Sequence, residues 1–256
     1  MDQRDGNFAQ VEILPAGYAD KILSARSVGI VRNLNLAGPL LLVGGMGLMF
    51  WAAFLHRTSI DESDPAKFRS AVILYSLGAG LMLIPALLPN PNKWLRRVAR
   101  QEISRRPDKV VDSHAPGVRF VEVVPKSSWL DTTLAENATD VGLLAIDLQN
   151  RFLFFEGDNE RYRVPAQAIV KCEQDAYTRL VPSRYSRRAG NDLIYYHFVV
   201  VTMKISEQKT VEMPFRIRTD STPANDQKWR DANYELLKEI NHLKATGTSH
   251  RPPISD

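Results

Sequence analysis

The sequence predicts a membrane-anchored protein in which a transmembrane α-hairpin precedes an α+β domain, a mostly antiparallel β sandwich or barrel of about seven strands with a C-terminal capping helix. Three observations predict this fold class. Residues 34–55 and 70–89 contain no charged side chain. Residues 118–219 alternate short runs of β-branched and aromatic residues with turn residues, which is typical of strands. Residues 222–243 carry apolar side chains at three- and four-residue steps, which is typical of an amphipathic helix.

Both uncharged runs are long enough to cross a bilayer. At a rise of about 1.5 Å per residue, each run is about 30 Å long as a helix, and a hydrocarbon core is also about 30 Å thick. The alternative is a pair of core helices in a soluble protein, but such helices seldom lack charge on every face. We therefore interpret residues 34–89 as a transmembrane hairpin with helices at 34–55 and 70–89.

Lysine and arginine predict the orientation of this hairpin, because basic residues are enriched on the cytoplasmic side of a membrane. The segment after the second run is more basic than the loop 56–69, which also contains acidic residues. Its basic residues are Lys93, Arg96, Arg97, Arg100, Arg105, Arg106 and Lys109. We therefore expect both termini to be cytoplasmic and the loop to be external.

The segments around the hairpin divide the rest of the chain. Residues 1–33 are predicted to form a cytoplasmic tail, in which 18–34 is either a short helix on the membrane surface or partly disordered. Residues 90–109 have apolar side chains at helical spacing among arginines, and they are predicted to form a basic juxtamembrane helix. The β domain with its helix then covers 110–244, and a disordered tail covers 245–256.

Seven segments of the β domain are predicted to be strands. They are 118–124, 142–148, 151–156, 160–164, 167–175, 193–205 and 209–219. Short connections at 149–150 and 157–159 suit tight hairpins, so neighbouring strands should be antiparallel. The helix that follows can begin at Thr222, whose hydroxyl suits an N-cap, with Pro223 in the first turn.

The middle of the β domain, residues 147–174, resembles bacterial pleckstrin-homology-like (PH-like) domains. Those domains show a strand, a turn with Asn or Asp next to Arg, an apolar strand, a Gly-containing turn, and a proline before the next strand. The matching residues are Asn150, Arg151, Phe152, Phe154, Gly157, Pro165 and Ile169. The resemblance, which covers residues 70–243 at most, implies two antiparallel sheets in a strongly bent sandwich with a C-terminal helix at one open end. Some members also carry a transmembrane hairpin before the domain, so the resemblance implies a bacterial inner (plasma) membrane.

Arginines gather in two places where an anionic lipid headgroup or phosphate could bind. Arginine forks bind phosphate bidentately, and tyrosines suit a headgroup interface. The connection 177–192 combines two tyrosines with Arg179, Arg184, Arg187 and Arg188. In PH-like folds a basic loop between strands is often where anionic lipid binds, so the resemblance implies lipid binding here; a solvated surface loop is the alternative. In the juxtamembrane helix, each basic residue near an anionic leaflet contributes about 1 kcal/mol, which applies to Arg96, Arg97 and Arg100. The alternative, which is compatible with lipid binding, is that these charges only set the topology.

Small residues lie at the centres of both uncharged runs. Such residues let helix backbones approach closely in a membrane. A phosphate-binding loop is the alternative for the glycines, but no strand precedes them and no lysine follows them in the required pattern. We therefore predict helix–helix packing at Gly44, Gly45, Gly47, Ser76 and Gly80, of which the last two have small-xxx-small spacing.

The sequence contains no recognised motif for catalysis or metal binding. Its five histidines are not arranged as ligand pairs, and no nucleophile elbow or phosphate-loop lysine is present. The single cysteine, Cys172, cannot form a disulfide within the chain. No catalytic residue, metal ion or cofactor is therefore predicted.

These observations predict a non-enzymatic integral membrane protein that presents a cytoplasmic binding or assembly module. Its partner would be membrane lipid, including anionic headgroups, another protein, or a second copy of the chain. Nucleic acid is not expected, because no DNA- or RNA-reading motif accompanies the basic residues. Two alternatives belong to other classes, namely an accessory subunit of a membrane transporter or channel complex and an enzyme of unrecognised type.

Overall fold

Two compact units make up the part of the chain that the structure describes. The computed structural model describes residues 7–18, 21–61, 64–88, 90–129, 138–182, 191–217 and 226–248. The helical unit is Ala25–Leu95, and the sheet unit combines Met1–Ser24 with Arg96–Asp256. The helical unit is therefore an insertion between two parts of the sheet unit.

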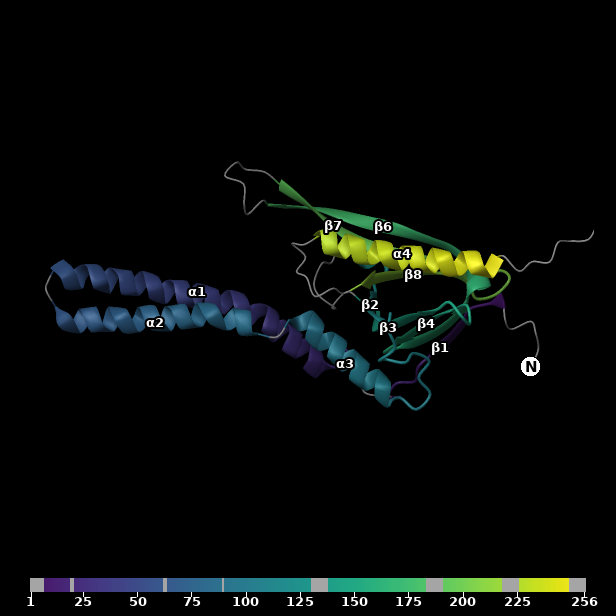
Figure 1. Ribbon diagram of the computed structural model, residues 1–256, viewed down its shortest axis with the longest axis horizontal. Coiled ribbons are helices and arrows are strands. Elements are labelled where there is room, and N and C mark those ends of the chain that lie inside the picture. The colour runs from purple at the N-terminus through teal and green to yellow at the C-terminus, as the bar shows by residue number, and fades with distance from the viewer. Residues whose placement is uncertain are drawn as a thin grey trace, which may run out of the picture. The chain divides into compact units, whose positions relative to one another are not determined.

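The helical unit contains two long helices, α1 (Ala25–Asp61) and α2 (Pro65–Leu87), which lie side by side (Figure 1). α2 begins at a capped end, because the side chain of Asp64 accepts hydrogen bonds from two backbone N–H groups of the first turn. Pro65 occupies the first position of the helix, where its missing N–H carries no cost. The first predicted span lies wholly within α1, and α2 covers the second up to Leu87.

The predicted loop 56–69 is mostly helical, which corrects the sequence-based expectation. α1 continues to Asp61, so the connection to α2 consists of residues 62–64 alone. The hydroxyls of Thr58 and Ser59 donate to carbonyl groups of the preceding turn of α1, and the rings of His56 and Phe68 lie 5.6 Å apart. The end of an uncharged run shows where the segment long enough to cross the hydrocarbon core ends. It does not show where the helix ends, because a helix can continue into the polar region.

The helix α3 (Pro91–Arg105) follows, within the segment predicted to be a basic juxtamembrane helix. Its first turn is capped by Asn90, whose side-chain oxygen accepts a hydrogen bond from a backbone N–H at 2.9 Å. Apolar side chains recur every four residues and form one buried stripe, Leu95, Ala99 and Ile103.

The sheet unit contains one curled, antiparallel sheet of eight strands in the described residues (Figure 1). The strands are β1 (Gln10–Ile13), β2 (Arg119–Val123), β3 (Asp140–Asp147), β4 (Phe152–Gly157), β5 (Glu160–Pro165), β6 (Ile169–Pro182), β7 (Asn191–Lys204) and β8 (Thr210–Ile217). Their order across the sheet is β1-β5-β4-β3-β2-β8-β7-β6. The prediction of a mostly antiparallel sheet with a C-terminal helix is therefore confirmed, with β2 to β8 in place of the seven predicted strands.

The additional strand, β1, comes from the segment that the sequence assigned to a tail. β1 pairs with β5, with Gln10 opposite Arg163. The N–H of Ala9 donates to the carbonyl of Lys204 at 2.7 Å, which links the start of this segment to the end of β7. From Ala25 the chain is already in α1, so the expectation of a separate surface helix or disordered segment over 18–34 is corrected.

The hairpin of β6 and β7 extends beyond the rest of the sheet. β7 pairs with β8 only from Val199 to Lys204, whereas β6 and β7 pair with each other as far as Pro182 and Asn191. The outer half is therefore a two-stranded ribbon. Residues 177–182 and 191–192 of the predicted connection 177–192 are strand, and residues 183–190 lie outside the described residues.

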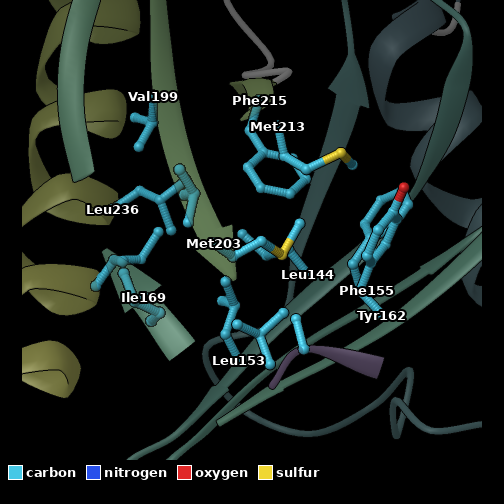
Figure 2. Close-up of a cluster of buried hydrophobic side chains, with 14 of the residues drawn as sticks. Leu144, Leu153, Phe155, Tyr162, Ile169, Val199, Met203, Met213, Phe215 and Leu236 are labelled. Carbon is cyan, nitrogen blue, oxygen red and sulfur yellow. The ribbon is translucent and has the colours of Figure 1, made fainter. Parts of the chain in front are cut away.

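The main core lies between the curled sheet and the last helix, α4 (Asp226–Thr248). α4 packs along β6, β7 and β8 (Figure 1). Its side chains at three- and four-residue steps, Leu236, Ile240 and Leu243, are fully buried. All three belong to one core cluster with aromatic and aliphatic residues from the sheet. Figure 2 shows Leu236 in this cluster together with Leu144, Leu153, Phe155, Met203 and Phe215. Thr222 and Pro223, the predicted cap, lie outside the described residues.

Candidate functional site

The helical unit exposes apolar side chains along both helices. In α1 and α2, large apolar side chains are up to 83% exposed, and only 11% of the most apolar window of each helix is buried. Both helices are long and apolar enough to cross a membrane. We call this surface the apolar belt; its members include Leu36, Leu40, Val43, Phe50 and Phe54 of α1 and Ile73, Leu77, Leu83 and Leu87 of α2. Water does not stabilise so continuous an apolar surface, whereas lipid tails do.

The close contact between α1 and α2 is made by Gly45 and Gly78. A Cβ atom added at Gly45 would lie 2.8 Å from the carbonyl oxygen of Gly78, and one added at Gly78 would lie 2.9 Å from the carbonyl oxygen of Gly45. The flexible side chains of Met49 and Met82 fill the space beside these glycines. The helices approach this closely because neither position carries a side chain.

Four of the five residues predicted to pack the helices together do not do so. A Cβ atom at Gly44, Gly47 or Gly80 would meet nothing within 4 Å. Ser76 is exposed, and its hydroxyl donates to the carbonyl of Val72 in its own helix. The composition located the small residues, but the rotation of each helix decides which of them face the partner.

A cluster of buried ionised side chains lies in the sheet unit, and we call Arg106, Glu156, Asp158 and Arg161 the charged cluster. Glu156 lies between the two arginines, 3.2 Å from Arg106 and 2.8 Å from Arg161. Arg106 also lies 3.5 Å from Asp158 and donates to the carbonyl of Gly157 at 2.6 Å. All four side chains are at most 3% exposed, so each charge depends on its partners.

The N-terminal flank, residues 7–24, contacts this cluster through side chains and backbone. Glu12 accepts a hydrogen bond from Arg161 at 3.1 Å. The hydroxyl of Tyr18 accepts another from Arg161 at 3.0 Å, and the Tyr18 ring lies within 6 Å of both guanidinium groups. The N–H groups of Ile22 and Leu23 donate to Asp158 at 2.8 Å. Only Ser24 separates Ile22 and Leu23 from the start of α1 at Ala25.

The C-terminal flank, residues 106–118, contacts the same cluster. It supplies Arg106 itself, and Asp108 pairs with Arg161 at 3.1 Å. The N–H of Val110 donates to Glu156 at 2.7 Å. Burial alone would lower the pKa of Arg161, but its hydrogen bonds to Glu156 and Asp108 outweigh that effect and raise the pKa. Arg161 is therefore a fixed positive charge that holds together both flanks and the sheet.

Asp140 supports the cluster from the neighbouring strand β3. Its carboxylate accepts hydrogen bonds from the backbone N–H groups of Asp158 and Asn159, in the turn between β4 and β5, and of Glu160, at the start of β5. A Cβ atom at Gly157 would collide with this carboxylate, so the turn requires glycine there. Burial raises the pKa of Asp140 to about 6, although the three N–H donors oppose the shift. Burial also raises the pKa of Asp158.

The structure describes four of the seven arginines that are predicted to bind lipid. In α3, Arg97 is exposed, whereas Arg96 and Arg100 are half-buried. Arg179 occupies a position in β6, opposite Ile194 of β7. The other three, Arg184, Arg187 and Arg188, lie outside the described residues.

Sequence reasoning missed the charged cluster, although its members left a signal. Glu156 and Arg161 stand next to aromatic residues on either side of a predicted turn, and Glu156 ends a strand that is otherwise apolar from Phe152. Ionised residues in such strands are buried only when they are paired. Nothing in the sequence shows that Arg106, far away in the chain, is one of those partners. Among the residues that the structure describes, no group of three or more His, Cys, Asp or Glu side chains is placed so that it could hold a metal ion.

No match was found for this chain among protein-family models, curated proteins or solved structures.

Proposed function

We propose that this chain is an integral membrane protein of a bacterial inner membrane, in which α1 and α2 anchor a cytoplasmic PH-like binding module. The module binds anionic lipid headgroups of the leaflet beside it and serves in assembly at that surface rather than in catalysis. The apolar belt is the observation that carries the proposal, since a bilayer is the environment in which such a surface is stable.

The position of the helical unit in the sequence, between two parts of the sheet unit, supports a topology with two membrane spans independently of the charge distribution. The N-terminal flank pairs with β5 and donates to Asp158, and the chain after α3 returns to the same turn of the same sheet. Two segments that touch one sheet lie on one side of any membrane. The chain between them therefore crosses a bilayer an even number of times, which agrees with two apolar helices.

The strand order supports a PH-like module. The strands β2 to β5 form one meander and β6 to β8 another, and the pairing of β2 with β8 joins the two. The sheet curls so that both meanders contribute to one core, with α4 packed against it. A bent pair of antiparallel sheets closed by a C-terminal helix is the arrangement that the PH-like resemblance implies.

Cysteine labelling of the full chain tests the orientation. After Cys172→Ala, a single cysteine replaces Ile60, which is exposed near the end of α1, or Glu207, which is exposed between β7 and β8. We expect a membrane-impermeant maleimide to label Ile60→Cys on intact cells, and to label Glu207→Cys only after permeabilisation. Equal labelling of both sites on intact cells, or extraction of the chain from membranes by alkaline carbonate, would contradict the proposal.

A further inference from the structure

The charged cluster joins three segments that are distant in sequence. Arg106 comes from the C-terminal flank, and Glu156, Asp158 and Arg161 come from the hairpin of β4 and β5. The N-terminal flank completes the set of partners through Glu12, Tyr18 and two backbone N–H groups. The full set of partners in this buried cluster therefore exists only when both flanks, the segment that leads into the helical unit and the segment that follows it, are in place.

Buried ionic groups differ from apolar ones in what they require. An apolar residue tolerates many neighbours, whereas a buried charge that loses its partner is strongly destabilising. If the C-terminal flank were absent, Glu156 would lose Arg106 and the N–H of Val110. If the N-terminal flank were absent, Asp158 would lose its two closest backbone donors. The paired charges favour closure of the sheet with both flanks in place over closure with one.

We propose that the charged cluster is an insertion checkpoint, which lets the sheet unit close fully only when both flanks of the hairpin lie on the same side of the membrane. In a chain whose helices have crossed twice, the flanks meet and every charge is paired. In a chain that has crossed once, the flanks are separated by the bilayer and the cluster stays incomplete. This inference rests on the proposed crossing of α1 and α2.

The test compares full chains with chains that cross once. Deletion of residues 66–87 removes the second crossing. The apolar-cluster variant, Arg106→Met with Glu156→Leu, Asp158→Asn and Arg161→Met, removes all four buried charges, and Asp158→Asn keeps a side-chain oxygen for the backbone N–H groups of Ile22 and Leu23. Both changes are made separately and together, and pulse proteolysis measures the cleavable fraction of the sheet unit in vesicles that freeze–thaw has made permeable to the protease.

We expect the deletion chain with the native cluster to have a cleavable fraction about a hundredfold above that of the full chain. The apolar-cluster variant should reverse most of this increase in the deletion chain and change the full chain little. In the full chain, Glu156→Gln should raise cleavage at least about tenfold, whereas Lys126→Met, which removes an exposed pair with Glu212, should leave it unchanged.

Two outcomes would overturn the checkpoint. One is a deletion chain with the native cluster that resists cleavage as well as the full chain. The other is a deletion chain that is cleaved equally with the native and the apolar cluster, because the charges would then play no part. Labelling of Ile60→Cys on intact cells is measured for the full chain as well. If Ile60→Cys is labelled, the proposed membrane topology holds and either of these two outcomes counts against the checkpoint alone.

Discussion

The pair Gly45 and Gly78 sets the separation of two helices by having no side chains. Each backbone lies so close to the other that a single added carbon would fall within 3 Å of a carbonyl oxygen. The neighbouring Gly44 has the same composition and lies in the same run, but a Cβ atom there would meet nothing. Composition alone does not distinguish the two positions, since only the rotation of the helix does.

We predict that Gly45→Ala destabilises the helical hairpin by about 1–3 kcal/mol, because the added methyl group forces the helices apart. Gly44→Ala is the matched control and should be neutral or slightly stabilising, since alanine favours a helix. SDS titration of the purified chain measures both variants. Equal effects at the two positions would show that the close approach at Gly45 is not important for hairpin stability.

Asp140 gives a second prediction for a single residue. Burial raises its pKa to about 6 in the folded protein from an ordinary value of 3.8, so the folded state binds its proton more tightly than the unfolded state. The stabilising contribution is full below pH 3.8 and is lost as the pH rises through 6. Lowering the pH from 7.5 to 5 should therefore raise the free energy of unfolding by about 1 kcal/mol from this group.

Asp140→Asn should reduce this rise, measured by pulse proteolysis across the pH range. Asp147→Asn is the control, because hydrogen bonds from Asn150 lower the pKa of Asp147. A lowered pKa contributes stability above the unfolded value, and that contribution is lost only as the pH falls through the lower folded value. The Asp147 variant should keep the full rise between pH 7.5 and 5. If both variants keep it, the source lies elsewhere.

At the scale of elements, α4 shows how an amphipathic pattern becomes a cap for the sheet. Leu236, Ile240 and Leu243 recur at the spacing of one helix face, and all three are fully buried in the core cluster, of which Figure 2 shows Leu236. A bidentate pair between Glu239 and Arg119 of β2 adds a second attachment at the edge of this face. The burial of this face makes α4 part of the core.

We predict that Ile240→Ala lowers the free energy of unfolding of the sheet unit by about 2–5 kcal/mol, the usual cost of such a deletion in a core. Glu235→Ala, at an exposed position of the same helix, should change it by less than about 0.5 kcal/mol. Urea titration of the detergent-solubilised chain provides the measurement. A small effect of Ile240→Ala would mean that α4 contributes little to the core.

At the scale of the whole molecule, the proposed lipid-binding function predicts that anionic lipid accompanies the chain. After reconstitution in mixed vesicles and detergent extraction, the purified chain should be enriched in phosphatidylglycerol over phosphatidylcholine. Replacing Arg184, Arg187 and Arg188 with glutamine should reduce the enrichment, by about fivefold for each contact of roughly 1 kcal/mol.

A separate variant with glutamine at Arg96, Arg97 and Arg100 tests the contribution of α3. The control replaces Lys204 and Lys209, which are exposed near the turn between β7 and β8, and should retain the enrichment. If all three variants retain it, a protein partner becomes the better candidate for this module.

Much of the architecture could be predicted because it depends on patterns local in the chain. The uncharged runs, the seven strands β2 to β8 and the stripe of α4 each repeat a physical signal over many residues. β1 escaped prediction because four residues with exposed side chains carry no such repeat. Its place is decided by pairing with β5, which lies far along the chain.

The amino-acid sequence was sufficient to identify the two apolar runs, the strands β2 to β8 and the helices α3 and α4, because these elements follow from uncharged composition or from periodicities of two and 3.6 residues. The three-dimensional fold was needed to show that Gly45 faces Gly78, that β1 pairs with β5, and that Arg106 joins Glu156 and Arg161 in one buried cluster. Those relations join residues far apart in the chain. Their energies depend on distance in space, since a charge or a close contact is stabilising only when its partner lies within a few ångströms.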